Sequence, residues 1–577
     1  MKHRESMTWS VAPGDPASER RLSASLGLCP LTARLLRNRR LQGPEESARF
    51  LHPRLEDLHD PFLLTDMDAA VARVHEALRE GEKIVVLGDF DADGVTATSL
   101  LVRLFRIFHA DVSYFIPDRL EEGYGLHEDA VERLAAGGAK LLITVDCGIT
   151  ALRPVARARA LGLDVIVTDH HEPAPAMPAC TAVLNPKREG ETYPFRDLAG
   201  VGVAFKLAWA LARDVSPSRE VTEDLKVFLW ESMGLVALGT VADVVPLRGE
   251  NRILVKHGLR ALGATRHPGE RALMEVSVKG KPDVTDLAFR MGPRINAAGR
   301  LGDSRKGVEL FTCESFEDAL ETASELDRMN RRRQTIEKRI FEQARDCVLA
   351  DGLDEAPAIV LASPAWHAGV IGIVASRLVE SFRRPVVMFR MEGEIGRGSA
   401  RSIPALHLHR SLGLCADTLE AFGGHAQAAG LTIRSDQFET FRAAFLDVVE
   451  DALEPDDLTE RLEVEAEVSL SAIDNALLAE LALLEPFGAG NPEPVLAVKD
   501  GFIAGKPRRM GSKGEHLSFF FREGDAAFRA VAFGLGERAR DLEKARADLA
   551  FTPVVNRFRG REKVELRVKD IRVTGTR

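Results

Sequence analysis

The sequence has no uninterrupted apolar run that approaches the roughly 18 residues a membrane span needs. Its N-terminus, MKHRESMTWSVAPGDPASERRLSASLG, lacks the continuous hydrophobic segment of a secretory signal. The six cysteines are scattered, with no CxxC pair and no Cys/His cluster at zinc spacing, so disulfides and a structural zinc are not expected. We therefore expect a cytoplasmic protein without a membrane segment.

What is present is typical of a multidomain globular chain, with 577 residues, of which 45% are apolar and 28% charged. The net charge of −10 is unevenly distributed. Residues 501–577 contain 18 Lys and Arg against 10 Asp and Glu, a balance of +8, and the rest of the chain carries −18. Such asymmetry indicates a C-terminal module that binds a polyanion; the alternative is a solvated basic tail.

Residues 60–260 alternate short apolar runs with longer helical patterns. The runs that predict strands are KIVVLGDF, ADVSYFIP, AKLLITVDCG, LDVIVTDHH and CTAVLNP. This alternation predicts an α/β fold with a parallel sheet covered by helices on both faces. Ligands of such sheets bind at the carboxyl ends of the strands.

Acidic residues and histidines follow three of these predicted strands. Asp89, Asp91 and Asp93 follow the first in GDFDADGVTATSLL, Asp146 follows another, and Asp169, His170 and His171 follow a third. Asp243 ends a further apolar stretch, LGTVADVVPL. A DADG or DHH segment taken alone can be a simple turn, but three clusters on one sheet edge indicate a functional site.

Carboxylates and imidazoles that converge on one edge repel one another unless a cation neutralises them. Hard divalent ions prefer oxygen ligands, and manganese also accepts imidazole, so Mn²⁺ or Mg²⁺ is expected. Two such ions about 3.5–4 Å apart can activate a water and stabilise both oxygens of a phosphoryl displacement.

Five segments are predicted along the chain. An N-terminal extension precedes an α/β domain, a connecting helix, a second α/β domain and a C-terminal segment of alternating strands that suggests an oligonucleotide-binding (OB)-like β-barrel. The expected boundaries are 1–60, 61–304, 305–350, 351–460 and 461–577.

The motifs GDFDADGVTATSLL, VDCGI, VTDHHEP and GTVADVVPL resemble, in order and spacing, the four motifs of the DHH phosphoesterase superfamily. GRGSARS and FGGHAQAAG resemble its associated DHHA1 substrate-binding domain. PDRLEEGYGLHEDA, GPRINAAGRLGD, FLHPRLEDLHDPFLLTDMDAAV and EPFGAGNPEP are similar to one branch, the bacterial RecJ single-stranded-DNA exonucleases. The resemblance covers nearly the whole chain beyond its first ~20 residues.

The resemblance implies a two-metal ligand set. Asp91 and Asp93 would each hold one ion, Asp146 would bridge the two, and His170 and Asp243 would complete the second site.

This sequence departs from the family pattern in one ligand. Many superfamily members have a histidine where this chain has Leu87, and Asp89 is the candidate to replace it. The resemblance also implies that His171 contacts the scissile phosphate or the leaving group; its alternative role is to support Asp169 or the backbone.

Substrate binding would require cations for terminal phosphates, and arginine suits phosphate because its planar fork donates two parallel hydrogen bonds. The residues that match the branch's substrate-contacting positions are Arg119, Arg294, Arg300, Ser399, Arg401 and His425. For Arg294 a structural ion pair is an almost equal alternative. In the basic terminal segment, cations alternate with phenylalanines that stack on bases or fill the core: Lys506, Arg508, Arg509, Lys513, Phe519, Phe520, Phe521, Arg557, Phe558 and Arg559.

Together these features predict a metal-dependent hydrolase that degrades single-stranded DNA from the 5′ end to mononucleotides in repair and recombination. A DHH phosphodiesterase acting on oligoribonucleotides or cyclic dinucleotides is the first alternative, and the basic C-terminal segment argues against it. A non-catalytic DNA-binding scaffold is the second, and the intact ligand set argues against that. From the family we expect a monomer that works with single-strand-binding protein and a helicase.

Overall fold

A computed structural model describes residues 7–119, 122–216, 220–558 and 561–576. The chain divides into two compact units. Residues 1–57 and 459–577 form the smaller unit, and Leu58–Leu458 form the larger one.

The larger unit begins with a five-stranded parallel sheet in the order β3-β2-β4-β5-β6. Its strands are β2 (Ile84–Gly88), β3 (Val112–Phe115), β4 (Leu141–Val145), β5 (Asp164–Thr168) and β6 (Ala182–Leu184). Strands β2 and β4 are buried along their whole length, which explains their continuous apolar runs. The predicted parallel α/β sheet is confirmed.

Helices connect these strands and cover the sheet. They are α4 (Met67–Glu80), α5 (Ala92–Ile107), α6 (Glu128–Ala136), α7 (Leu152–Ala160) and α8 (Gly200–Asp214). Helix α5 begins at the acidic motif itself, because the Asp91 side chain accepts hydrogen bonds from the amides of Asp93 and Gly94 as its N-cap.

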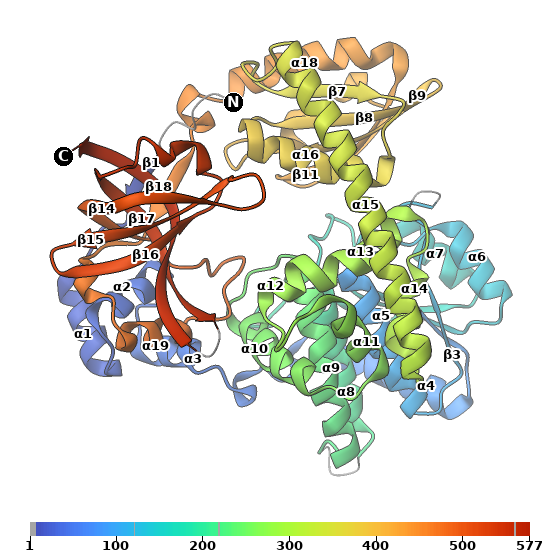
Figure 1. Ribbon diagram of the computed structural model, residues 1–577. Coiled ribbons are helices and arrows are strands. Elements are labelled where there is room, and N and C mark those ends of the chain that lie inside the picture. The colour runs from blue at the N-terminus through green and yellow to red at the C-terminus, as the bar shows by residue number, and fades with distance from the viewer. Residues whose placement is uncertain (1–6, 120–121, 217–219, 559–560, 577) are drawn as a thin grey trace. The chain divides into compact units, whose positions relative to one another are not determined.

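A mostly helical region follows in the same unit (Figure 1). Its elements are α9 (Glu223–Ala242), α10 (Gly249–Ala264), α11 (Pro268–Ser277), α12 (Val284–Asp286), a π-helical turn η3 (Leu287–Met291), α13 (Gly292–Leu301), α14 (Arg305–Thr312) and α15 (Phe316–Ala350). The 35-residue helix α15 packs on α11 and α13 and, further along, on α16 (Ala368–Phe382). It therefore connects the first α/β region to the second.

The second α/β region has a mixed five-stranded sheet in the order β10-β11-β9-β8-β7. Its elements besides α16 are β7 (Ile359–Ser363), β8 (Val386–Glu392), β9 (Ile395–Arg401), α17 (Leu408–Gly413), β10 (Ala421–Gly424), β11 (Ala428–Arg434) and α18 (Phe438–Ala452). Helix α18 packs on one face of this sheet, where Phe441 and Phe445 of the helix share a hydrophobic core with Phe389 of β8.

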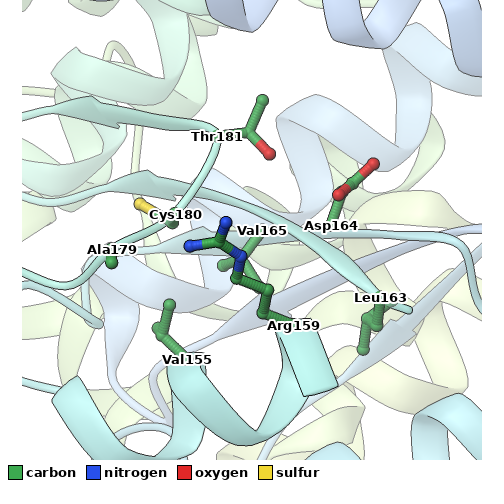
Figure 2. A pocket seen from close by; sticks show the side chains of 8 residues that line it. All are labelled: Val155, Arg159, Leu163, Asp164, Val165, Ala179, Cys180 and Thr181. Atoms are coloured by element: carbon green, nitrogen blue, oxygen red, sulfur yellow. The ribbon is translucent and has the colours of Figure 1, made fainter. Parts of the chain in front are cut away.

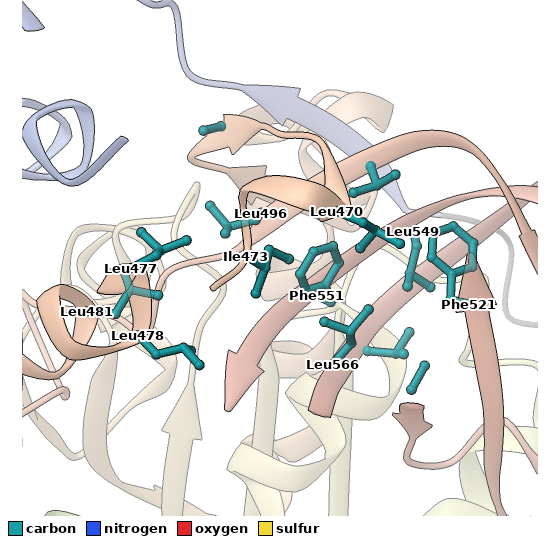
Figure 3. Close-up of a cluster of buried hydrophobic side chains, with 14 of the residues drawn as sticks. Leu470, Ile473, Leu477, Leu478, Leu481, Leu496, Phe521, Leu549, Phe551 and Leu566 are labelled. Atoms are coloured by element: carbon teal, nitrogen blue, oxygen red, sulfur yellow. The ribbon is translucent and has the colours of Figure 1, made fainter. Parts of the chain in front are cut away.

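The smaller unit contains a closed five-stranded barrel, as predicted. Its strands are β14 (Leu496–Met510), β15 (His516–Glu523), β16 (Ala526–Ala532), β17 (Ala545–Phe558) and β18 (Arg561–Thr576). They pair in the order β14-β15-β16-β18-β17, and β17 closes the barrel on β14. Figure 3 shows the barrel core, with Phe521, Leu549, Phe551 and Leu566 from the strands beside leucines of α19 (Asn475–Leu483).

The N-terminal residues pack on this barrel rather than forming a separate extension. Their elements, with the short strands they meet, are β1 (Thr8–Val11), α1 (Pro16–Leu26), α2 (Pro30–Asn38), α3 (Pro44–Leu51), β12 (Arg461–Val464) and β13 (Ala466–Glu467). Strand β1 pairs with β12 in parallel, and the buried Arg39 binds Glu465 at 2.7 Å and Asn491 at 2.8 Å. No pattern in the sequence predicted this long-range pairing.

Among the described residues, α9 is the one helix long and apolar enough to cross a membrane. Its apolar window is 72% buried inside the protein, as in the core helix of a globular fold.

Candidate metal centre and anion pocket

The predicted acidic residues meet at one edge of the parallel sheet. Asp89 follows β2, Asp146 follows β4, and Asp169 and His170 follow β5. The fourth element is not a strand: Asp243 is the C-cap of α9, whose last turn reaches the same edge. Asp146 has a φ of +61°, a left-handed conformation that is uncommon outside glycine and occurs at functional sites.

Two groups of ligand atoms form this cluster, and a third group, Asp146, His170 and His171, shares Asp146 with the first and His170 with the second. In one, atoms of Asp89, Asp91 and Asp146 all lie within 4.8 Å of one another. In the other, Asp93, His170 and Asp243 do so. Nε2 of His170 lies 3.1 Å from Oδ1 of Asp146, which joins the two groups, and 3.6 Å from Oδ2 of Asp243.

Backbone contacts fix Asp93 and Asp146 in place. Asp93 accepts hydrogen bonds from the amides of Gly200 at 2.7 Å and Val201 at 2.8 Å, so its carboxylate sits on the N-terminus of α8. Gly200 is required by the packing, because a β-carbon there would lie 2.6 Å from Oδ1 of Asp146. A substitution at Gly200 would displace Asp146 from His170.

The donor atoms of the cluster fit a cation. Oδ1 of Asp89, Oδ1 of Asp146 and both ring nitrogens of His170 are buried without a hydrogen-bond partner among the described residues. Burial and then the neighbouring Asp91 carboxylate raise the pKa of Asp93 to about 7. Burial, with repulsion from Asp93, also raises the pKa of Asp146 and Asp243. Burial lowers the pKa of His170 to about 3, so its imidazole is neutral and can coordinate a metal.

Asp89 lies where it can replace the histidine ligand that many superfamily members have at the position of Leu87. Leu87 is fully buried in the core between the sheet and its helices, while Asp89, two residues further on, joins the group with Asp91 and Asp146. Burial, followed by repulsion from Asp91, raises the pKa of Asp89. The geometry therefore favours Asp89 as the third donor of the first group.

His171 is held beside the cluster by Asp169. Oδ1 of Asp169 lies 2.8 Å from Nδ1 of His171 and accepts the amides of both histidines, while Oδ2 accepts the amide of Ile149. Burial would lower the pKa of His171, but the hydrogen bond and the charge of Asp169 raise it. An imidazolium oriented in this way can contact a phosphate or protonate a leaving oxygen.

Three of the predicted arginines lie close together. The Arg119 guanidinium lies 4.8 Å from the centre of the Phe90 ring, and Nη1 of Arg300 donates to the carbonyl of Gly369 in α16 at 3.1 Å. Nη1 of Arg401 donates to Oγ of Ser399 at 3.1 Å. No carboxylate pairs with these three arginines among the described residues. Burial, then repulsion from Arg119 and Arg401, lowers the pKa of Arg300 to about 9; burial, then Arg119, lowers that of Arg401 to about 10.

This arrangement, which we call the anion pocket, consists of Arg119, Arg300, Ser399 and Arg401. Partly buried like charges that form no direct ion pair favour an anion between them, and the guanidinium geometry suits phosphate. His425 belongs to the same region, because burial and then the charges of Arg401 and His171 lower its pKa.

Arg294 differs from the other predicted substrate residues. Its Nη2 lies 2.8 Å from Oδ1 of Asp327 in α15, and its Nη1 donates to the carbonyl of Arg290. This is the structural ion pair considered as its alternative role, and its contact with substrate stays a prediction.

Two residues of the site were not predicted from the sequence. The Tyr124 hydroxyl lies 3.2 Å from Nδ1 of His171 and donates to the carbonyl of Asp146 at 3.3 Å. Oδ1 of Asn296 in α13 accepts the amide of Ala92 at 2.7 Å and so supports the acidic turn. Both lie in motifs quoted for the family resemblance, but no residue-level pattern marked them.

A pocket of about 320 Å³ opens at the opposite edge of the sheet (Figure 2). Asp164, the first residue of β5, lines it together with Arg159, Cys180 and Thr181. Because the metal cluster follows the carboxyl ends of the strands, this pocket at an amino end is separate from it.

The barrel carries exposed aromatic and basic side chains. Along β15 the side chains alternate, so Phe519 and Phe521 are buried while Phe520 is 56% exposed. Phe533, 57% exposed, packs edge-on against His516 at 5.1 Å between ring centres. The predicted cations Lys506, Arg508, Arg509 and Lys513 are all exposed. The side chains of Arg557, Phe558 and Arg559 lie outside the described residues.

Comparison with known proteins agrees with this architecture. Residues 83–240 match the DHH family N-terminal domain, residues 355–451 the DHHA1 domain and residues 464–570 the RecJ OB domain. The single-stranded-DNA-specific exonuclease RecJ of Escherichia coli strain K12 is 37% identical over 94% of this chain and 96% of its own length. RecJ of Bacillus subtilis strain 168 is 36% identical over 98% of this chain and 71% of its own length.

A solved structure extends the likeness to the fold. The crystal structure of RecJ in complex with Mn²⁺ from Thermus thermophilus matches with a TM-score of 0.84 and 33% identity, over 99% of this chain and 80% of that one. The corresponding Mg²⁺ complex matches with a TM-score of 0.77. The chain therefore belongs to the RecJ family of single-stranded-DNA-specific exonucleases.

Proposed function

We propose that this protein is an exonuclease that degrades single-stranded DNA from its 5′ end to 5′-mononucleotides in DNA repair and recombination. The observation that carries the proposal is the pair of ligand groups that meet through Asp146 and His170 beside the anion pocket. Terminal-phosphate recognition next to a two-metal cluster is the arrangement that cleavage from one end requires. The family membership supports the same activity.

The cofactor is Mn²⁺ or Mg²⁺, as in the structural relatives. Asp89, Asp91 and Asp146 would hold one ion, and Asp93, Asp146, His170 and Asp243 the other. When bound, the two ions would activate a water and stabilise the attacking and leaving oxygens.

The protein's own groups then orient the reaction. Asp146 holds the two ligand groups together, and the α8 N-terminus holds Asp93. His171, kept in place by Asp169, would contact the scissile phosphate or give its proton to the leaving oxygen. The anion pocket would take the 5′-phosphate, which places the first phosphodiester over the metal cluster.

The two alternative functions have less support. A phosphodiesterase for short oligoribonucleotides or cyclic dinucleotides would not need a barrel with exposed phenylalanines and cations, whereas a single strand would use that surface. In a non-catalytic scaffold there would be no reason to gather the buried oxygens of Asp89 and Asp146 and the ring nitrogens of His170 in one place without hydrogen-bond partners.

The test is nucleotide release from a 5′-phosphorylated single strand labelled at either end, with Mn²⁺, Mg²⁺ or EDTA. We expect early release of a labelled mononucleotide from the 5′-labelled strand only, its loss in EDTA, and no release from blunt duplex. Early mononucleotide release from the 3′ label, or release that persists in EDTA, would contradict the proposal.

Metal binding should stabilise the protein more at higher pH. A carboxyl whose pKa is raised in the folded state keeps a proton that the unfolded chain releases. The metal-free protein therefore loses stability as the pH rises from about 3.9, the ordinary aspartate pKa, towards the pKa of the folded state, which is about 7 for Asp93. Divalent ions replace those protons. We expect the difference in unfolding midpoint between Mn²⁺ and EDTA to grow from about pH 5.5 to about pH 8, measured by calorimetry.

The matched control for this prediction is Asp93→Asn, which removes one of the perturbed carboxyls. Its metal-free form should lose less stability with pH, and Mn²⁺ should stabilise it less. A midpoint difference that stays constant across this pH range in the wild-type protein would refute the explanation.

Replacing Phe520 should weaken binding of single strands. A stacked base contributes about 1–3 kcal/mol, so Phe520→Ala is expected to raise the Kd for a single strand about 5- to 150-fold. Folding should be unaffected because the side chain is exposed. Fluorescence anisotropy with a labelled oligonucleotide measures the effect, and Val573→Ala on β18 serves as the exposed control. Equal Kd values for the two variants would exclude Phe520 as a stacking residue.

The proposal extends to the protein's surroundings on the family resemblance alone. We infer a monomer that acts in the cytoplasm with single-strand-binding protein and a helicase.

A further inference from the structure

One continuous helical stretch, η3 followed by α13, runs along the edge of the metal centre. A β-carbon at Gly299 would lie 2.6 Å from the carbonyl oxygen of Phe90, and Asn296 binds the amide of Ala92. A β-carbon at Gly292 would lie 3.1 Å from that of Ala242, the neighbour of Asp243. Arg300, near the end of α13, belongs to the anion pocket.

These contacts follow one another in a fixed order along η3 and α13. From its C-terminal end it passes the anion pocket, then the acidic turn of the first ligand group, then the Asp243 side of the second group. A strand with its 5′-phosphate in the anion pocket and its first phosphodiester at the metals would continue towards the N-terminal end of the same stretch. That end is η3.

The η3 turn presents an exposed aromatic side chain. Phe289 is 75% exposed, the highest value for a phenylalanine among the described residues. It lies in a π-helical turn, a rare distortion that is frequent at functional sites. Single exposed apolar residues are common, so this exposure alone would decide nothing.

A second exposed apolar residue lies just beyond the end of α9, the helix that meets this stretch at Ala242. Val244, directly after the ligand Asp243, is 69% exposed and has a φ of +63°. A β-branched residue in this conformation is a backbone outlier, and such strain persists where a site requires it. The close approach of Gly292 to Ala242 thus places the segments that carry Phe289 and Val244 side by side, next to the ligand Asp243.

We propose that Phe289 stacks on a nucleobase immediately 3′ of the scissile phosphodiester, with Val244 as a second apolar surface of this base subsite. The inference deepens the proposed function and rests on it, because it takes the 5′-phosphate to lie in the anion pocket. Bases offer their faces to such a side chain only when they are unpaired or splayed from a duplex. The subsite therefore contributes to the preference for single strands.

The test combines Phe289 variants with abasic substrates. We would measure kcat/KM for 5′-phosphorylated single strands that carry one abasic site at successive positions from the 5′ end. Phe289→Ala should lower kcat/KM on intact DNA about 5- to 150-fold, the equivalent of one stacked base. Phe289→Trp should retain activity, and Phe289→Leu, which keeps apolar area without an aromatic face, should fall between.

The abasic substrates identify the contact. In the wild-type protein, an abasic site at one position just beyond the first nucleotide should reproduce the loss seen with Phe289→Ala, and in that variant the same site should cause no further loss. Val227→Ala is the bystander control, because Val227 is exposed on α9, 16 residues and about 24 Å from Asp243. Its kcat/KM should equal that of the wild type.

Each result decides the inference. Full activity of Phe289→Ala on intact DNA, or losses from the variant and the abasic site that add at every position, would overturn the base subsite. A loss in Phe289→Trp as large as in Phe289→Ala would also overturn it. If the wild-type protein released no nucleotide from the 5′ end, the proposed function itself would fail, which the intact substrate reports separately.

Discussion

Replacing Asp146 with asparagine is expected to lower kcat for nucleotide release at least about 1,000-fold, beyond the 10–100-fold typical of losing a residue that only supports a ligand. Asp146 is the residue through which the two ligand groups meet, so its loss affects both metal sites. Asparagine keeps the size of the side chain and tolerates the φ of +61° at this position. The change therefore removes a negative ligand without breaking the turn.

Single-turnover release from a 5′-phosphorylated strand measures the effect, with strand binding followed in parallel. The control is Asp164→Asn, an aspartate at the amino end of β5 that pairs with Arg73 away from the cluster. We expect near wild-type release for the control and retained strand binding for Asp146→Asn. Release by Asp146→Asn within about tenfold of the wild type would show that Asp146 does not bridge the sites.

The parallel sheet could be predicted because its strands are continuous apolar runs bounded by turn residues. Successive residues of β2, such as Val85 and Val86, point to opposite faces of the sheet and are both buried, so the run is apolar without alternation. The strand ends then necessarily meet at one edge, so the order of strands and motifs alone places Asp89, Asp146 and His170 together. Both α/β regions and the barrel are confirmed.

The sequence could not predict which element carries Asp243. Helix α9 is buried over most of its surface, so its apolar residues do not follow a helical period and resemble any buried segment. The packing of the N-terminal residues on the barrel could not be predicted from the sequence either. It depends on pairs such as Arg39 with Glu465 and Cys29 with Glu480, which are more than 400 residues apart in sequence.

Side-chain roles were predicted less well than positions. The alternation of β15 required that some of its phenylalanines be buried, but only the register with β14 and β16 identifies Phe520 as the exposed one. Arg294 and Arg300 lie six residues apart in one motif, yet one pairs with Asp327 while the other joins two further arginines. Residues on distant elements decide whether such a side chain forms a structural contact or stays available to substrate. A short sequence motif does not contain those residues.

Replacing Arg401 with glutamine is expected to abolish most of the preference for a 5′-phosphorylated end. Loss of one member of a buried, hydrogen-bonded charge pair costs about 2–5 kcal/mol of binding, so KM for a 5′-phosphorylated strand should rise about 30-fold or more. A strand with a 5′-hydroxyl lacks the anion and should be affected little. The ratio of kcat/KM for the two strands measures the change.

The stability of the same variant separates a binding role from a structural one. Burial and repulsion from Arg119 lower the pKa of Arg401 to about 10, so its charge is unfavourable in the folded protein without a bound anion. Glutamine should therefore leave the unfolding midpoint unchanged or raise it, although binding of the phosphate is lost. Arg434→Gln is the control, since Arg434 lies at the other end of β11 from the residue that pairs with Arg401.

A lower midpoint together with equal losses on both strands would make Arg401 a structural residue and remove the 5′-phosphate from the anion pocket. A stable variant that loses activity only on the phosphorylated strand would show that repulsion between these partly buried arginines is retained in this fold because phosphate binding relieves it.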